Sequence, residues 1–177
     1  MINKNLSILV AYSLNRVIGA QGVIPWKLPS ERNRFKEICK GKKVIMGRRT
    51  FEEIGKALPY CTIVVVSKSL RTVPEGCVLA KSLKEAVEMC SNDEVLIAGG
   101  QEIYEQAMPY CNKIYATEIL HNFEGDRFFP ALNIKAWTKT VQAEHTECGI
   151  RYNYVTYENK KVVQRCQSSV YQKKVIQ

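Results

Sequence analysis

The sequence has no long apolar run, and this excludes a helix that crosses a membrane. Its apolar runs, such as Ile63–Val66 and Val95–Ala98, are far shorter than the roughly 20 residues that span a bilayer. Proline and glycine are also scarce, with six and ten residues among 177, which excludes a collagen-like or low-complexity chain. What remains is a globular protein, and 177 residues suit a single domain with one core.

The sequence also lacks the cysteine spacings of disulfide frameworks and metal sites. It has no CxxC pair and no Cys/His spacing of a zinc module, and its seven cysteines cannot all pair within the chain. No small-residue cleavage site follows the first apolar stretch, so we interpret Leu6–Tyr12 as a strand rather than a signal peptide. We therefore expect reduced thiols, no metal and a cytoplasmic location.

Acidic residues are absent from one end of the chain. Residues 160–177 contain five lysines and arginines and no acid, so they hold five of the nine net positive charges. The four net positive charges that remain suit the binding of a polyanionic small molecule. Basic and aromatic residues do not alternate in the way that favours binding of single-stranded nucleic acid. We expect a domain of residues 1–159 and a flexible basic tail of residues 160–177. A basic nucleic-acid-binding domain is the non-enzymatic alternative.

Eight apolar segments bounded by turn residues predict strands, many of them rich in Val, Ile and Tyr. They are Leu6–Tyr12, Lys43–Met46, Ile63–Ser67, Val78–Ala80, Val95–Ala98, Lys113–Ile119, Lys139–His145 and Arg151–Tyr157. Helical patterns lie between the early ones, at Ser30–Cys39, Ser82–Cys90 and Gln101–Met108, and the second begins with a Ser-x-x-Glu capping box.

This order of elements predicts an α/β fold with a single domain. Strand and helix alternate over the first two-thirds of the chain, which indicates a mostly parallel sheet with helices on both faces. The last two strands have no helix between them, so the C-terminal strand should pair antiparallel. Ligands of such sheets bind at the carboxyl ends of the strands.

Two stretches carry features of binding sites. Residues 17–31 form a long loop with glycine and proline that enters a helix with Glu31 in its first turn, and loops of this length in small domains are often functional. Taken alone, Glu31 is a favourable partner for the helix dipole. Gly47-Arg48-Arg49-Thr50 joins a strand to a helix, so backbone N–H groups and two guanidiniums can meet an anion there.

Four segments together resemble the dihydrofolate reductase family, in order and in spacing. They are residues 17–31, Gly47–Glu52, Ala98–Tyr104 and Glu124–Pro130, and the resemblance extends from Leu6 to Tyr157. It implies a dihydrofolate reductase-like fold of about eight strands. It also implies a monomeric enzyme, of the kind that antifolates target, that reduces 7,8-dihydrofolate to tetrahydrofolate with NADPH and so supplies one-carbon metabolism.

The resemblance assigns the chemistry to three residues. Glu31 accepts hydrogen bonds from the 2-amino group and N3 of the pterin, a donor pair that suits a carboxylate. Hydride is added to C6, and N5 receives its proton from a water held by the mobile loop, assisted by Glu31. Trp26 and Thr117 hold ordered water and contact this carboxylate.

The resemblance also names the walls of the substrate pocket, which without it would be interpreted as core. They are Leu9, Val10, Ala11, Ile18, Ile24, Leu28, Phe35 and Ile54. Phe35 lies one turn beyond Glu31, where it faces the same pocket and packs on the aminobenzoyl ring.

For NADPH, the resemblance places backbone and basic side chains after successive strands, with a cis bond between Gly99 and Gly100. The cofactor residues are Ala11, Ile18, Gly19, Gly47, Arg48, Arg49, Thr50, Ser67, Lys68, Lys81, Ala98, Gly99, Gly100, Gln101, Glu102, Ile103 and Tyr104. Asp126 braces the loop at residues 19–28. Lys81 taken singly also fits an exposed surface lysine.

One family feature is missing from this sequence. Where the family has an arginine that binds the α-carboxylate of the substrate's glutamate, this chain has Cys61, which cannot form that ion pair. We hypothesise that Arg32 binds this carboxylate, with Lys36 beside it, although a solvated basic helix face explains both residues equally well. A related reductase of a pterin or pyrimidine without a glutamate tail is therefore the alternative enzyme.

Overall fold

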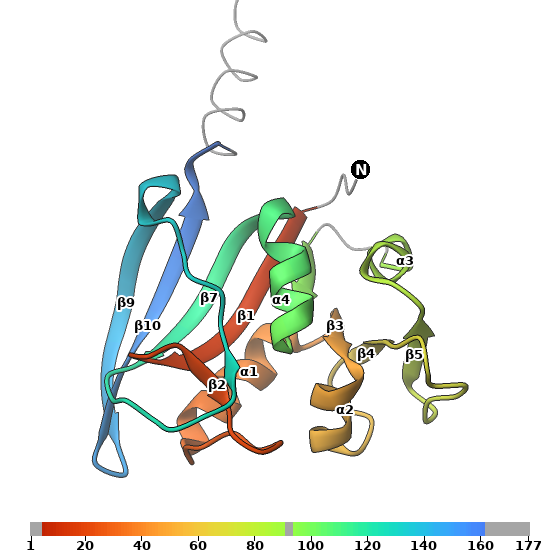
Figure 1. Cartoon of the computed structure of the whole chain (residues 1–177), viewed down its shortest axis with the longest axis horizontal. Coiled ribbons are helices and arrows are strands. Elements are labelled where there is room, and N and C mark those ends of the chain that lie inside the picture. Colours follow the sequence, from red (N-terminus) through yellow and green to blue (C-terminus); the bar gives the residue numbers. More distant parts are fainter. Residues whose placement is uncertain (1–4, 91–93, 162–177) are drawn as a thin grey trace, which may run out of the picture.

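The fold is built on one eight-stranded sheet. The computed structural model describes residues 5–90 and 94–161, and Figure 1 shows the sheet with its helices. The strand order is β5-β4-β3-β6-β1-β7-β10-β9. The strands are β1 (Asn5–Ser13), β3 (Lys43–Gly47), β4 (Thr62–Val66), β5 (Cys77–Ala80), β6 (Glu94–Ile97), β7 (Cys111–Ile119), β9 (Trp137–Glu147) and β10 (Ile150–Asn159). All eight predicted strands are confirmed, with bounds that differ by a few residues.

The direction of the strands also follows the prediction. The pairs β1·β6, β1·β7, β3·β6, β3·β4 and β4·β5 are parallel. β10 is antiparallel to both β7 and β9. Its pairing with β9 is a hairpin through Cys148 and Gly149, which both have positive φ. Tyr154 of β10 lies directly opposite Thr117 of β7.

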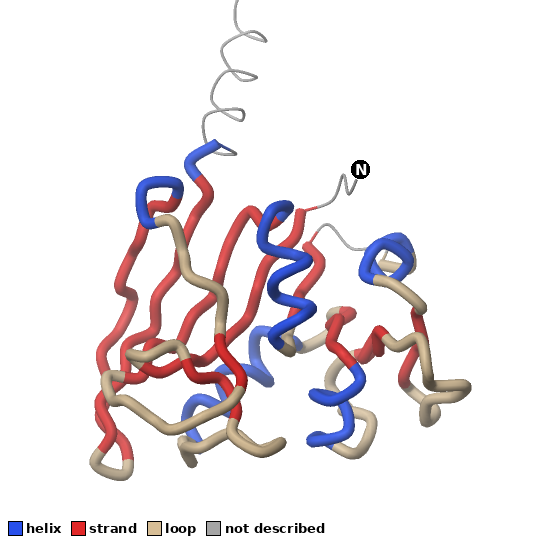
Figure 2. Tube along the Cα trace, in the orientation of Figure 1, coloured by secondary structure: helices blue, strands red, loops and turns tan. Residues whose placement is uncertain are grey.

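Helices cover both faces of the sheet because successive residues of a strand point to opposite sides. On β1, Leu6, Ile8 and Val10 pack with α3 (Leu83–Glu88) and α4 (Gln101–Ala107). Leu9 points to the other face, toward α1 (Pro29–Cys39) and α2 (Arg48–Ile54). Each is at most 5% exposed, and full burial of a Leu, Ile or Val side chain contributes about 1.5–3 kcal/mol. Figure 2 shows α4 crossing one face of the strands.

Helix starts follow local rules that the sequence makes visible. α1 begins at Pro29, whose missing N–H costs nothing in a first turn. At α3 the Ser82 hydroxyl accepts from the Glu85 N–H at 3.1 Å, as the capping box predicts. The reciprocal bond runs from the Lys81 N–H to Glu85, at 2.7 Å, rather than from Ser82.

A second, two-stranded sheet was not predicted. It pairs β2 (Val17–Gly19) with β8 (Arg127–Phe128), and Figure 2 shows the two loops that contain them running side by side. Strands of three and two residues are too short to display a period of two. Short 3₁₀ turns at Met108–Tyr110 and Ile134–Ala136 precede β7 and β9.

The six cysteines within residues 5–90 and 94–161 are all free, and Cys166 lies outside these ranges. No helix in the same ranges is both long and apolar enough for a membrane span. The predicted basic tail lies outside the described residues from position 162 onward.

Candidate active site

Glu31 lies in the first turn of α1, half-buried against the sheet. Desolvation raises the pKa of its carboxyl group above the ordinary 4.5, while the charges of Arg34 and Arg32 oppose this shift. On α4, which covers the other face of the sheet, Tyr104 is 5% exposed; burial raises the pKa of its phenol, and the charge of Glu31 adds to the shift. The carboxyl group is thus held in a largely dry site with positive charge nearby.

The helix that bears Glu31 is capped by a distant carboxylate. Leu28 is the N-cap residue and forms no side-chain cap. Glu147, at the end of β9, instead accepts from the Ser30 N–H at 3.2 Å and from the Ser30 hydroxyl at 3.2 Å. Sequence analysis missed this contact, because Glu147 and Ser30 are 117 positions apart and no local pattern links them.

The loop before α1 is packed against the protein at its C-terminal end and exposed to solvent in its middle. Trp26 and Leu28 are 5% and 2% exposed and pack with Ile119 and Tyr152, while Val23 and Ile24 are 62% and 53% exposed. Leu28 and Trp26 therefore fix the entry into α1. Ile24 lies at the exposed part of the loop rather than in a packed wall.

Thr117 is completely buried on β7. Its hydroxyl accepts a hydrogen bond from Nη1 of Arg34 at 3.1 Å, and among the described residues no hydrogen bond joins it to Glu31. Arg34 also donates to the Ala116 carbonyl at 3.2 Å, and its guanidinium lies 4.3 Å from the ring centroid of Tyr154. The side chain of Arg34 therefore turns toward the sheet.

The predicted walls of the substrate pocket lie in more than one layer. Phe35 and Ile54 pack with Leu9 on the α1 and α2 face, and Ala11 packs beside Trp26 and Leu28. The side chain of Val10 lies on the opposite face, in the cluster of α3 and α4, and Ile18 packs there too. Only the backbone of Val10 can therefore face the pocket.

The turn from β6 into α4 brings backbone close to α2. The peptide bond between Gly99 and Gly100 is cis, as the family resemblance implied. A Cβ at Gly100 would lie 3.0 Å from the Thr50 hydroxyl, and one at Gly47 would lie 3.2 Å from Ile103. The Gly47 N–H donates to the Gly99 carbonyl at 2.7 Å. Ala98 and Ile103 are buried beside this turn, and Glu102 is exposed.

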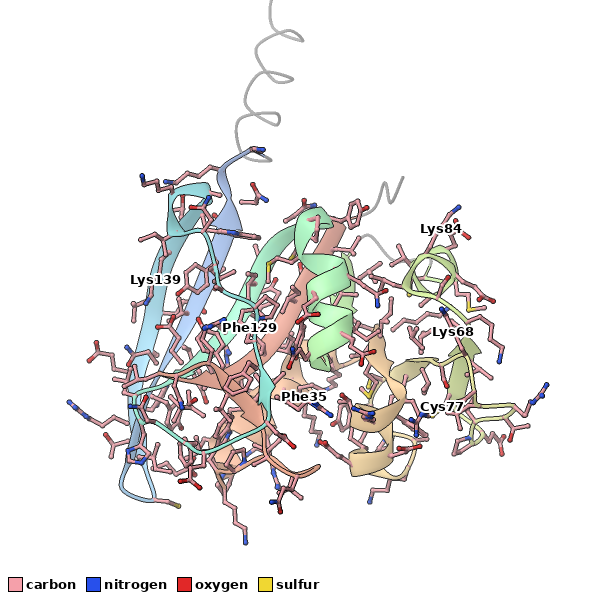
Figure 3. The ribbon with its side chains drawn as sticks, in the orientation of Figure 1. Phe35, Lys68, Cys77, Lys84, Phe129 and Lys139 are labelled. Carbon is pink, nitrogen blue, oxygen red and sulfur yellow. The ribbon has the colours of Figure 1, made fainter. Side chains whose placement is uncertain are left out.

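The basic residues predicted for NADPH lie at the carboxyl ends of β3, β4 and β5. Arg48 pairs with Glu52 at 2.8 Å, and Arg49 is exposed. The Ser67 hydroxyl accepts from the Leu70 N–H at 3.1 Å, and Lys81 donates to the Leu70 carbonyl at 2.8 Å, so both shape the loop after β4. Figure 3 shows Lys68 on this side of the molecule and Phe35 nearer its centre.

Asp126 forms two hydrogen bonds with the loop that precedes α1. Asp126 accepts from the Gln21 N–H at 3.3 Å, and its own N–H donates to the Gly19 carbonyl at 3.1 Å. Gln101 at the start of α4 accepts from the Phe128 N–H at 2.9 Å. Phe129, labelled in Figure 3, packs edge-on against Tyr104 with ring centroids 5.3 Å apart. The small sheet therefore connects the loop to α4.

Cys61 lies half-buried after α2, next to Tyr60. Burial raises the pKa of its thiol to about 11, so the thiol stays protonated and uncharged at neutral pH. The ammonium of Lys36 lies 5.8 Å from the Tyr60 ring centroid, and Arg32 is exposed one turn earlier on α1. Lys36 is thus a cation that the structure places beside this region.

Comparisons with known proteins agree with this geometry. A family model described as dihydrofolate reductase matches residues 5–159. A dihydrofolate reductase of Bacillus subtilis is 37% identical over 160 residues, covering 88% of this chain and 95% of the relative, and one of Haemophilus influenzae is 42% identical over 132 residues, covering 74% and 82%. A structure of Enterococcus faecalis dihydrofolate reductase complexed with NADP(H) and RAB-propyl superposes with a TM-score of 0.81 at 29% identity, covering 88% and 96%.

Proposed function

The chain belongs to the dihydrofolate reductase family, and we propose that it reduces 7,8-dihydrofolate with NADPH at the site around Glu31. The reaction adds hydride to C6 and a proton to N5 of the pterin. The observation that carries the proposal is the position of Glu31, whose carboxyl group lies in the first turn of α1 and is desolvated by burial, with the charges of Arg34 and Arg32 nearby.

The residues at the strand ends fit NADPH. Gly47, Gly99 and Gly100 allow the turn from β6 into α4 to pack closely on α2, where a side chain would meet Thr50 or Ile103. No side chain on these three residues shields their backbone from a dinucleotide. Arg49 and Lys68 are exposed cations beside them, and a 2′-phosphate is the group that cations at this end would recognise. When bound, NADPH supplies the hydride. The role of this protein is to hold NADPH against the pterin and to exclude water.

Glu31 orients the pterin and sets the field around N5. The ionised carboxylate accepts from the 2-amino group and N3, which fixes the ring face presented to the cofactor. Its negative charge favours a proton on the pterin, and the dry surroundings strengthen this effect. The exposed loop at Val23 and Ile24 can close over the ring and position the water that donates to N5.

For the substrate's glutamate, we propose that the cations of α1 replace the missing arginine. Arg32 and Lys36 lie four positions apart on α1. The ammonium of Lys36 lies 5.8 Å from the ring centroid of Tyr60, the residue before Cys61. A flexible ammonium binds a carboxylate as a point charge, without the two parallel hydrogen bonds of a guanidinium. This arrangement lowers the contribution of the substrate's glutamate to binding but does not remove that contribution.

Replacing Cys61 with Arg is expected to lower the KM for dihydrofolate. A charge-assisted hydrogen bond contributes about 1.5–3 kcal/mol, so the change should be roughly tenfold or more. The KM for dihydrobiopterin, which has no glutamate, should stay constant and serves as the internal control. Cys61→Ala is the matched variant without a cation. Equal KM values in C61R and C61A would contradict the assignment of this position to the tail.

The overall activity is tested by following NADPH absorbance with each substrate. We expect turnover with dihydrofolate, weaker turnover with NADH, and lower kcat/KM with dihydrobiopterin. A preference for dihydrobiopterin would favour the reductase of a tail-free pterin. Salt-sensitive nucleic-acid binding that is lost on truncation after Asn159, without reductase activity, would favour the basic binding domain.

We further propose a monomeric enzyme of the cytoplasm, with residues 1–159 as the catalytic domain. The free cysteines support a reducing compartment. Sedimentation of the purified chain at several concentrations tests the oligomeric state, and removal of residues 160–177 tests whether the domain needs its tail.

A further inference from the structure

Arg34 occupies an unusual position for a positively charged side chain. It lies three residues after Glu31 on α1, yet its side chain is directed between α1 and the sheet. No salt bridge of the described residues includes it. Burial lowers the pKa of its guanidinium, whereas the charge of Glu31 raises it. A cation in such surroundings requires partners that hold it in place.

A cross-strand pair supplies those partners. Thr117 of β7 and Tyr154 of β10 are directly opposite each other, and Arg34 contacts both, with a hydrogen bond of 3.1 Å to Thr117 and a distance of 4.3 Å to the Tyr154 ring. The face of Tyr154 attracts a cation, and His145 lies 4.6 Å from the same ring. The Ala116 carbonyl accepts a second hydrogen bond at 3.2 Å. The guanidinium is therefore held by two strands at a defined place.

The hydrogen bond to Thr117 determines the direction of that hydroxyl. A guanidinium can only donate, so the Thr117 oxygen is the acceptor and its O–H hydrogen is left to donate elsewhere. Thr117 pairs with Ala11 in β1, and Ala11 packs beside Trp26 and Leu28, so Thr117 belongs to the face of the sheet that α1 covers. A donor hydroxyl on that face suits a carboxylate or a water bound to it.

We propose that Arg34 is a positioning residue of the pterin site, which orients the Thr117 hydroxyl as a donor and supplies a half-buried positive charge near Glu31. This role rests on the proposed function and adds a residue to it. The titratable and charged groups that act on Glu31 or Arg34 are Arg32 on α1, Tyr104 on α4, Tyr115 on β7 and Tyr154 on β10. Burial raises the pKa of Tyr104 and of Tyr115. Arg34 and Arg32 are the cations among these groups, and Arg32 is exposed.

The test is a titration of Glu31 itself, which needs no turnover. The protein is labelled with ¹³C at the glutamate side-chain carboxyls, and Glu31→Gln identifies the Glu31 resonance. Opposite charges at close range commonly lower a carboxyl pKa by about one to three units, so Arg34→Leu should raise the Glu31 midpoint by roughly one unit. Arg34→Gln keeps a donor for Thr117 but removes the charge, and should raise the midpoint as well. Arg34→Lys should restore most of the wild-type value.

Controls separate this role from a structural one. Lys40→Gln removes an exposed charge just after α1 and should leave the Glu31 midpoint unchanged. Tyr154→Leu removes the ring under Arg34 and should shift the midpoint in the same direction as R34L, while Tyr154→Phe should not. If folded R34L and R34Q titrate like the wild type, or if R34K titrates like R34L, the proposal is wrong. Loss of reductase activity in the parent protein would refute the proposed function but would not alter this titration.

Discussion

Glu31→Gln is expected to lower kcat/KM for dihydrofolate by roughly 10²- to 10⁴-fold, the range for loss of a positioned acid–base group. Gln retains the size of the side chain but presents an amide where the pterin needs a charged acceptor. It also removes the field that favours a proton on N5. The matched control is Glu37→Gln, which removes an exposed acid from the same helix and should leave kcat/KM unchanged. Near wild-type turnover of E31Q would contradict the mechanism.

The same substitution should increase stability at neutral pH. Burial raises the folded pKa of Glu31 above 4.5, even with the attraction of Arg34 and Arg32 included. Below its unfolded-state pKa the carboxyl group is protonated in both states and does not reduce the free energy of unfolding. That free energy falls as the pH rises through the folded-state pKa, because ionisation is less favourable in the folded protein. E31Q avoids that loss. Its thermal midpoint should exceed the wild-type value at neutral pH and approach it below pH 4.5, as measured by calorimetry across this range.

Gly125→Ala is expected to reduce kcat by roughly 10²-fold, although it changes no residue of the pterin site. A shift of about 1 Å in the position of the reacting groups can have this effect. A Cβ at Gly125 would lie 2.4 Å from Cγ1 of Val17 and 2.6 Å from the Gly19 carbonyl oxygen. The second contact is with backbone, so β2 has to move away from the turn that holds it. The hydrogen bond from Asp126 to Gly19, 3.1 Å long, would be lost with it.

The measurement for this variant is the single-turnover rate of NADPH oxidation together with thermal unfolding. Glu124→Ala changes the exposed neighbour of Gly125 and should behave like the wild type. Asp126→Asn, which keeps an acceptor but removes its charge, should fall between the two. A wild-type rate in G125A would show that the small sheet has no influence on the loop.

Much of the fold could be predicted from the sequence because its signals are local. The eight strands are short apolar segments rich in β-branched residues, and burial on both faces of a parallel sheet requires such runs. Ser82 and Glu85 mark the start of α3 within four residues. The β2 and β8 strands escaped prediction because they contain three and two residues and are stabilised by each other, more than a hundred positions apart.

The directions of side chains at the site were harder to predict from the sequence than the strands and helices. Val10 and Leu9 are neighbours, and the alternation of a strand predicts that they face opposite sides, yet the pattern does not say which side holds the ligand. The i and i+3 positions of Glu31 and Arg34 on one helix were visible, but an arginine there is as compatible with solvent as with a buried contact. Its direction depends on Tyr154, which lies 120 positions later along the chain.

The sequence by itself determined the parts of the candidate site whose proposed function depends on local backbone and charge. These are the carboxyl group in the first turn of α1, the glycines between β6 and α4, and the basic residues after β3, β4 and β5. Only the tertiary structure decided that Glu147 caps α1 and that Arg34 turns inward to Thr117. The physical reason is that both contacts join segments distant in the chain, and their geometry exists only after the C-terminal hairpin has paired with β7.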